Sequence, residues 1–171
     1  VTPVKIEYST DNGGNWILIS NNTVGTEGAN TYNWTPIPDL KSEQCLVRVS
    51  DNRTIFSSEV TDNSNATFSV RPVINVTAPA NGDNVVVNSV TTPIRWTYTG
   101  TQLTTVDVQY STNGGTNWTT IASGVAANSG NTYIWPTVPA STTLNGKVRV
   151  YDSTNPSIEG ISATFNIVGN L

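Results

Sequence analysis

The sequence predicts an all-β protein, and three observations carry that prediction. Apolar and polar residues alternate along 4–9 and again along 45–50, which is the period of a strand with one buried face. Clusters of Asn, Gly, Asp and Pro separate such runs at intervals of about 8–12 residues. No segment of the sequence shows the apolar period of an amphipathic helix. Short strands joined by turns at this spacing indicate an immunoglobulin-like β-sandwich.

The chain also repeats itself. VKIEYSTDNGGNW, at 4–16, matches VDVQYSTNGGTNW, at 106–118, without a gap. NTYNWTPIP then matches NTYIWPTVP, LVRVSD matches KVRVYD, and NATFSV matches SATFNI, always in the same order. Repeated landmarks in a fixed order predict tandem copies of one module, which we place at residues 1–71 and 72–171.

The two modules are unequal at their beginnings. Residues 72–100 precede the matched region of the second module and predict two or three further strands, for which the first module has no equivalent. A sandwich without its opening strands is expected to expose core residues and strand edges. The core residues concerned are Val4, Ile6, Val47 and Trp34. Two explanations stay open: the protein extends upstream, or another chain supplies the strands by β-augmentation. A start at Val1 is typical of a mature or trimmed product, although an arbitrary boundary would look the same.

The quoted repeats contain turn clusters, DNGG and NGG, that predict tight hairpins. Asn and Gly are favoured there because they tolerate a positive φ. The Asp11 carboxylate is expected to accept hydrogen bonds from backbone N–H groups inside its turn. We therefore interpret the repeated phrase as a structural turn rather than a ligand-binding loop. The hairpin residues are Asp11, Gly13 and Gly14 in the first module, and Asn113, Gly114 and Gly115 in the second.

Two resemblances rest on these residues. STDNGGNW is similar to the Asp-box hairpin, roughly Ser-x-Asp-x-Gly-x-Thr-Trp, with Asn15 in the Thr place and with Asn113 replacing the Asp in the second copy. In Asp-box proteins this motif stabilises the hairpin and is usually remote from any active site. The whole second module resembles the Ig-like modules repeated in large secreted and surface-anchored bacterial proteins, and also the Ser/Thr-rich cell-wall module of fungal surface proteins. The second resemblance implies an extracellular β-sandwich that acts as a spacer, stalk or adhesive unit and, as is usual for such modules, has no catalytic residues of its own.

Composition argues against several classes of function. The net charge is -4, the pI is near 4.5 and the eight basic residues are scattered, whereas nucleic-acid binding needs clustered Lys and Arg. The chain has no His and one Cys, which removes Ser-His and Cys-His pairs and a Cys-based zinc site. No stretch approaches the roughly 18 apolar residues of a membrane span. We expect no enzyme activity, no cofactor, no nucleic-acid partner and no membrane insertion.

The aromatic residues suggest one candidate ligand site. Trp34 and Trp135 recur inside matched strands and Trp96 lies at a predicted strand centre, so these three are expected in the core. Trp16 and Trp118, which follow the hairpins, are the more exposed pair in this prediction. They are the candidate contacts for a glycan.

The charged residues and the cysteine are assigned structural roles. Arg48 and Arg149 are expected to pair across strands with Glu7 or Asp107. Cys45 is expected to be a small buried hydrophobe, with a disulfide between two chains as the alternative. Loop carboxylates are expected to cap turns, because no spacing gathers the six to eight oxygens that Ca²⁺ prefers. These carboxylates are Asp51, Asp62, Asp83 and Asp152.

Six asparagines begin N-x-Ser/Thr sequons, but chance alone would supply about as many in a chain this rich in Asn, Ser and Thr. Glycosylation is therefore permitted rather than indicated. The six are Asn21, Asn33, Asn52, Asn65, Asn75 and Asn117.

Together these features predict a non-enzymatic structural module at the cell surface or outside the cell. It would be a spacer, a stalk, or a component of a fibre or surface layer, in contact with neighbouring Ig-like modules or copies of itself. One alternative is a self-assembling filament subunit completed by strands from a neighbouring chain. Another is a carbohydrate-binding or adhesion module that contacts surface glycans.

Overall fold

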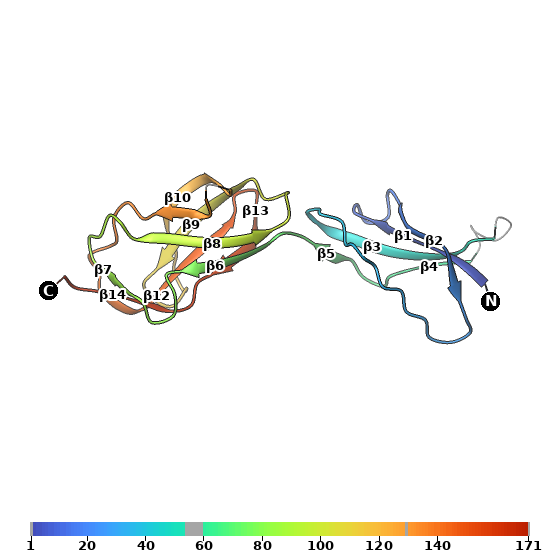
Figure 1. The fold of residues 1–171 in the computed structure, drawn as a ribbon, viewed down its shortest axis with the longest axis horizontal. Coiled ribbons are helices and arrows are strands. Elements are labelled where there is room, and N and C mark those ends of the chain that lie inside the picture. Colours follow the sequence, from blue (N-terminus) through green and yellow to red (C-terminus); the bar gives the residue numbers. More distant parts are fainter. Residues whose placement is uncertain (1, 54–59, 129, 171) are drawn as a thin grey trace. The chain divides into compact units, whose positions relative to one another are not determined.

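The protein is all-β, as the alternating sequence pattern predicts. The structure, a computed structural model, describes residues 2–53, 60–128 and 130–170, and these contain strands and turns without a helix. The chain divides into two compact units, residues 1–71 and 72–171, which we call unit 1 and unit 2 and describe separately (Figure 1). Over the described ranges, no helix has the length and apolar character needed to cross a membrane.

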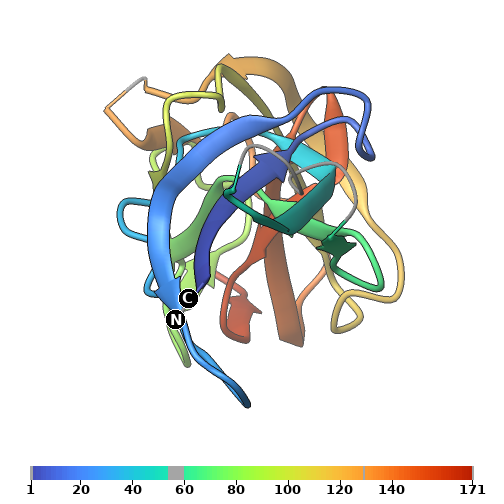
Figure 2. The same cartoon turned by 90° about the vertical axis from the view of Figure 1, so that its right-hand side faces the viewer.

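The described residues of unit 1 form one antiparallel sheet. Its strands follow the order β2–β1–β3–β4, and β5 pairs with the first part of β3. Both views show β1 and β2, in blue, running side by side (Figures 1 and 2). The strands are β1 (Thr2–Ser9), β2 (Ile17–Gly25), β3 (Ser42–Asp51), β4 (Thr61–Asn63) and β5 (Phe68–Val70).

Unit 2 contains two sheets and is consistent with a β-sandwich. The larger sheet has the order β10–β9–β12–β14–β7, with β13 paired to β12, and the smaller sheet has the order β11–β8–β6. In Figure 1, β6 and β8 form a layer across β9 and β12. The strands are β6 (Val73–Ala78), β7 (Asn84–Val86), β8 (Pro93–Thr99), β9 (Thr105–Ser111), β10 (Thr119–Ala126), β11 (Thr132–Ile134), β12 (Thr143–Asp152), β13 (Asn155–Ile161) and β14 (Phe165–Val168).

The predicted opening strands of the second module are present as β6, β7 and β8. The predicted burial of Trp96 at a strand centre is confirmed, since its side chain is 1% exposed in β8. The sequence pattern did not indicate that β7 pairs with β14. This pair is parallel, whereas the other strand pairs between described residues are antiparallel.

The core of unit 2 lies between its two sheets. Apolar side chains from β6 and β8 pack against apolar side chains from β9 and β12, so each sheet supplies the cover for the other. The side chains concerned are Ile74, Val76, Ile94 and Trp96 on one side, and Val106, Val108, Val148 and Val150 on the other.

Unit 1 has the same sheet without such a cover among the described residues. By sequence, β1, β2, β3 and β5 match β9, β10, β12 and β14. Val49 is 40% exposed, whereas Val150 at the matched position is 0% exposed. Among the described residues of unit 1, Ile6 and Cys45 are the buried hydrophobic side chains.

The expected exposure of four core residues in unit 1 is partly wrong. Ile6 is buried, with 7% of its surface exposed, because it lies on the central strand β1 between Ser20 of β2 and Val49 of β3. The other three, Val4, Trp34 and Val47, are half-buried rather than exposed. The side-by-side strands of one sheet therefore shield part of the face that would otherwise be open.

We expect the matched valines to differ in their contribution to stability. Val150→Ala should lower the free energy of unfolding of unit 2 by about 2 kcal/mol, because it removes buried methyl groups and leaves a cavity. Val49→Ala should cost roughly a third as much in unit 1, because the side chain is already partly in water. Both losses of stability can be measured by hydrogen exchange at increasing urea concentration, followed on peptides from each unit. Equal costs would contradict the difference in burial.

Candidate functional site

The first repeated feature is the hairpin between β1 and β2, which a serine and an aspartate hold closed. Ser9 Oγ donates a hydrogen bond to Asp11 Oδ1 at 2.7 Å and accepts one from the Gly13 N–H at 2.8 Å. Asp11 Oδ1 also accepts the Asn15 backbone N–H at 2.8 Å. Ser9 is fully buried, so its hydroxyl is committed to this turn.

The hairpin between β9 and β10 repeats these contacts. Ser111 Oγ donates to Asn113 Oδ1 at 2.8 Å and accepts the Gly115 N–H at 2.9 Å, and Asn113 Oδ1 accepts the Asn117 N–H at 2.9 Å. Because an amide oxygen replaces a carboxylate oxygen at the same place, the second turn needs no charge. The repeated polar residues bind the backbone of their own turn.

The backbone explains most of the glycines in these turns. The left-handed residues are Asn12 (φ 58°) and Gly13 (φ 90°) in the first turn, and Gly114 (φ 71°) and Gly115 (φ 95°) in the second. Gly14 has a different reason: a Cβ built there would lie 3.0 Å from Asp11 Oδ2. Asn12 was not among the predicted hairpin residues, although Asn is the non-glycine residue best suited to this conformation.

The carboxylate of Asp11 makes one contact that an amide cannot make. Its second oxygen, Oδ2, accepts the Asn15 side-chain N–H at 2.6 Å. Hydrogen bonds from the Ser9 hydroxyl, and then from the backbone and side chain of Asn15, lower the pKa of Asp11 to about 2.

The second repeated feature is an indole that lies between a hairpin and an arginine. The Arg48 guanidinium lies 4.2 Å from the ring centroid of Trp16, and the Arg149 guanidinium lies 5.0 Å from that of Trp118. On the hairpin side, a Cβ built on Gly115 would lie 3.2 Å from Trp118 Cζ2. Both indoles are half-buried, so the ring faces proposed for glycan stacking are partly occupied by the protein itself.

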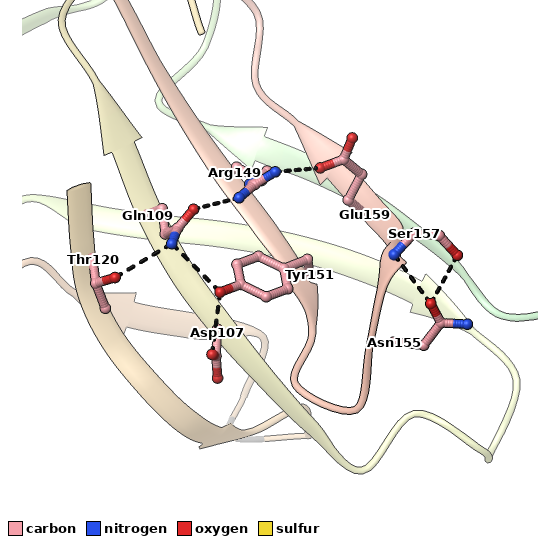
Figure 3. A network of polar contacts seen from close by, with 8 residues as sticks. All are labelled: Asp107, Gln109, Thr120, Arg149, Tyr151, Asn155, Ser157 and Glu159. Atoms are coloured by element: carbon pink, nitrogen blue, oxygen red, sulfur yellow. Dashed lines mark hydrogen bonds and ion pairs between the residues drawn. The ribbon is translucent and has the colours of Figure 1, made fainter. Parts of the chain in front are cut away.

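In unit 2 the arginine belongs to a network of polar side chains on the outer face of the larger sheet (Figure 3). Arg149 donates to Gln109 and Glu159, and Gln109 donates to the hydroxyl groups of Thr120 and Tyr151. Sequence reasoning missed Gln109 and Tyr151. The alternation along β9 and β12 places both on the same face as Arg149, and this signal could have identified them.

The expected pairing of the arginines is confirmed in unit 1 and wrong in unit 2. Arg48 lies opposite Glu7, and its Nη2 is 2.7 Å from Glu7 Oε2. Arg149 lies opposite Gln109, and Asp107 lies opposite Tyr151, so the strand register separates the predicted pair.

Asp107 has other hydrogen-bond donors. The hydroxyl groups of Ser153 and Tyr151 lie 2.6 Å and 3.2 Å from its carboxylate oxygens, and the Gly124 N–H lies at 2.9 Å. Burial alone raises the pKa of Asp107, but these hydrogen bonds outweigh it and lower the pKa. Burial, followed by the nearby Asp107 charge, raises the pKa of Tyr151. In unit 1 the pKa of Glu7 is likewise lowered, since hydrogen bonds from Arg48 and Lys5 outweigh burial.

Three of the four loop carboxylates cap turns. Asp152 accepts hydrogen bonds from the backbone N–H and the hydroxyl of Thr154, at 2.8 Å and 2.7 Å. Asp51 accepts the backbone N–H of Arg53 at 2.8 Å. Asp83 accepts the backbone N–H of Ala80 at 2.8 Å. Asp62 is exposed on β4. Within the described ranges, no three His, Cys, Asp or Glu side chains gather as a metal site would require.

The remaining candidate residues are the sequon asparagines and the cysteine. Asn52 is half-buried and donates to Asn22, while the other sequon asparagines are exposed. The expected burial of Cys45 is confirmed, since it is 0% exposed. The exposed asparagines are Asn21, Asn33, Asn65, Asn75 and Asn117.

The third feature is an apolar groove on the face of unit 1 that carries Ile6. Its volume is about 270 Å³, and both its walls and its floor are largely hydrocarbon. Sequence reasoning anticipated apolar exposure here but did not identify Tyr32 and Val24, which are 46% and 64% exposed. The lining includes Val4, Ile6, Val24, Tyr32, Trp34 and Val49.

Comparisons of the chain with protein-family models, with curated proteins and with solved structures find no match. The repeated contacts and the groove are the features of the chain that bear on its function.

We expect the two hairpins to respond differently to acid. The folded pKa of Asp11, about 2, lies below its ordinary value of 3.8, so its stabilising contribution is complete above that ordinary value and is lost as the pH falls toward 2. The hairpin that contains Asn113 has no such group. In an NMR titration, the Asn15 amide resonance should shift with a midpoint near 2 while the matched Asn117 resonance stays constant. Asp11→Asn should abolish the Asn15 shift, and a midpoint at the ordinary value would contradict the prediction.

Proposed function

We propose that this chain is a non-enzymatic extracellular structural protein made of tandem Ig-like β-sandwich modules, the first of which lacks its opening strands. It acts as a spacer, a stalk, or a component of a fibre or surface layer. Its partners are neighbouring Ig-like modules or further copies of the same chain.

The observation that supports this proposal is that the shared residues of the two units form a scaffold. The hairpin contacts recur, and so does the aromatic pair below them: the ring centroids of Tyr8 and Trp34 are 5.0 Å apart, and those of Tyr110 and Trp135 are 5.1 Å apart. The repeated polar side chains bind their own turns and strands. A repeated unit with such contacts is suited to extending a chain and resisting mechanical force rather than to catalysing a reaction.

A mechanical role is further supported by the strand pair near the end of unit 2. β14 is the last strand and runs parallel to β7, with Asn84, Val85 and Val86 opposite Asn166, Ile167 and Val168. When the two ends of unit 2 are pulled apart, parallel strands are loaded in shear, so their hydrogen bonds resist together rather than one after another. One of these bonds runs from the Val87 N–H to the Val168 carbonyl at 2.9 Å.

Single-molecule stretching tests the mechanical role. Unit 2 should unfold in one step that releases roughly 300 Å of chain, given about 3.3–3.6 Å per extended residue. Val87→Pro should lower the unfolding force, because it removes the N–H that bonds to Val168. Val87→Ala is the control, since it shortens the same side chain but keeps the N–H. Equal forces for the two variants would refute a load-bearing β7–β14 pair.

The location is tested separately. Antibodies against the chain should label intact cells of the source, or detect the protein in the medium, and protease added outside the cells should remove the signal. Detection in lysed cells only would overturn the extracellular proposal.

Glycan contact at Trp16 and Trp118 is the second candidate function, and it is less well supported because the protein occupies part of each ring face. Tryptophan fluorescence titrated with cell-wall oligosaccharides tests it. A saturable change that Trp16→Phe and Trp118→Phe abolish would favour this adhesive role.

A further inference from the structure

One short sequence has two conformations in this protein. NTYIW, at 131–135, contains strand β11, which pairs with β8. NTYNW, at 30–34, is irregular and pairs with no strand among the described residues. Four of the five letters are the same, so intrinsic preference is a poor explanation of the difference. The partner strand is the better explanation, because a strand is stable only when a neighbour accepts its backbone hydrogen bonds.

The partner strand in unit 2 also covers the apolar face. β8 brings Ile94 and Trp96 onto the core, with 0% and 1% of their surfaces exposed, and β6 adds Ile74 and Val76. At the edge of this cover, the backbone N–H of Trp96 donates to the Asn131 carbonyl at 3.1 Å. The same two strands thus bury the core and order the segment that contains β11.

In unit 1, the described residues present the matching face without these strands. Val4, Val47 and Trp34 are half-buried, whereas the matched Val106, Val148 and Trp135 are almost completely buried. The groove of about 270 Å³ lies on this face, between the sheet and the segment that contains Tyr32 and Trp34. One added pair of strands would therefore provide both a backbone partner for 31–33 and a cover for the apolar side chains.

The opening strands of another copy of this chain are poorly suited to fill the groove. β6 and β8 are already buried in their own unit, and lending them would expose the core that they cover. A separate hairpin of the same kind has no such cost. In unit 2 the antiparallel pair of β6 and β8 precedes β9 directly in the sequence, and residues 100–104 join β8 to β9. The equivalent position in unit 1 is directly ahead of β1.

We propose that the apolar face of unit 1 is the docking site for a β-hairpin of the β6–β8 kind, carried by the same polypeptide directly ahead of β1. Its inner strand pairs with 31–33, as β8 pairs with β11, and its apolar side chains fill the groove. It places aliphatic residues where Ile74, Val76 and Ile94 lie in unit 2, and an indole where Trp96 lies. This inference rests on the modular part of the proposed function, namely that both units are copies of one module, and not on the location of the protein.

A graft tests the proposal on the full chain. Residues 72–103 are placed directly ahead of Thr2, which matches Thr104, and hydrogen exchange is measured on peptides that cover 30–35. The exchange of these amides should slow by at least about tenfold relative to the ungrafted chain and approach that of 131–136. The control graft carries Ile94→Asp and Trp96→Asp in the added copy only, and it should give no protection. Unit 2 provides an internal check of folding in every sample.

A second measurement keeps the proposal testable if the amides respond weakly. In the ungrafted chain, Val49→Ala should shift the urea midpoint of unit 1 only slightly. In the grafted chain, the same substitution should shift that midpoint about as much as Val150→Ala shifts the urea midpoint of unit 2.

Two results would overturn the proposal. One is equal protection by the graft and its control. The other is an ungrafted chain that forms dimers in which 31–33 is already protected, because a second copy would then be the occupant. Neither result bears on whether the protein is found outside the cell, so the docking site and the extracellular role can fail independently.

Discussion

An apolar sheet face must be buried against a second layer, and most features of this protein follow from whether that layer is present. In unit 2, β6 and β8 supply it, and the valines of β9 and β12 are removed from water. In unit 1 the described residues contain the same sheet without the layer. Its groove, its exposed Val49 and its irregular 31–33 segment are three effects of that one difference.

Features that depend on nearby residues are the same in both units, and features that depend on distant residues are not. Each hairpin is closed by bonds between residues two to four positions apart, so it forms whether or not the core is covered. Trp34 and Trp135 also keep the same tilt against their tyrosines, because those contacts lie within one sheet and its adjoining segment. The strand at 132–134 depends on β8, about 40 residues away in sequence, and the described part of unit 1 has no counterpart of it.

The same distinction explains what the sequence could predict. Period-two alternation located the main strands and the burial of Cys45, because which face a side chain occupies is a local property. The burial of Trp96 was predicted from its place at the centre of a predicted strand. The pairing of Arg149 with Glu159 rather than Asp107 depends on strand register, which the pattern of one strand does not determine. The groove was predicted only as exposed core residues. Its wall at Tyr32 depends on how an unpaired segment lies, and no alternation marks that.

The seam between β3 and β5 has a practical consequence. Cys45 lies opposite Phe68 there, at the position that glycine occupies in unit 2, where a Cβ on Gly146 would lie 2.7 Å from the Phe165 ring. The chain has one sulfhydryl, and it is 0% exposed. Because the thiol is fully buried, an alkylating reagent can reach it only when unit 1 opens around it. The rate at which Cys45 is modified therefore reports how often unit 1 opens. Unit 2 has no thiol and does not contribute to this rate.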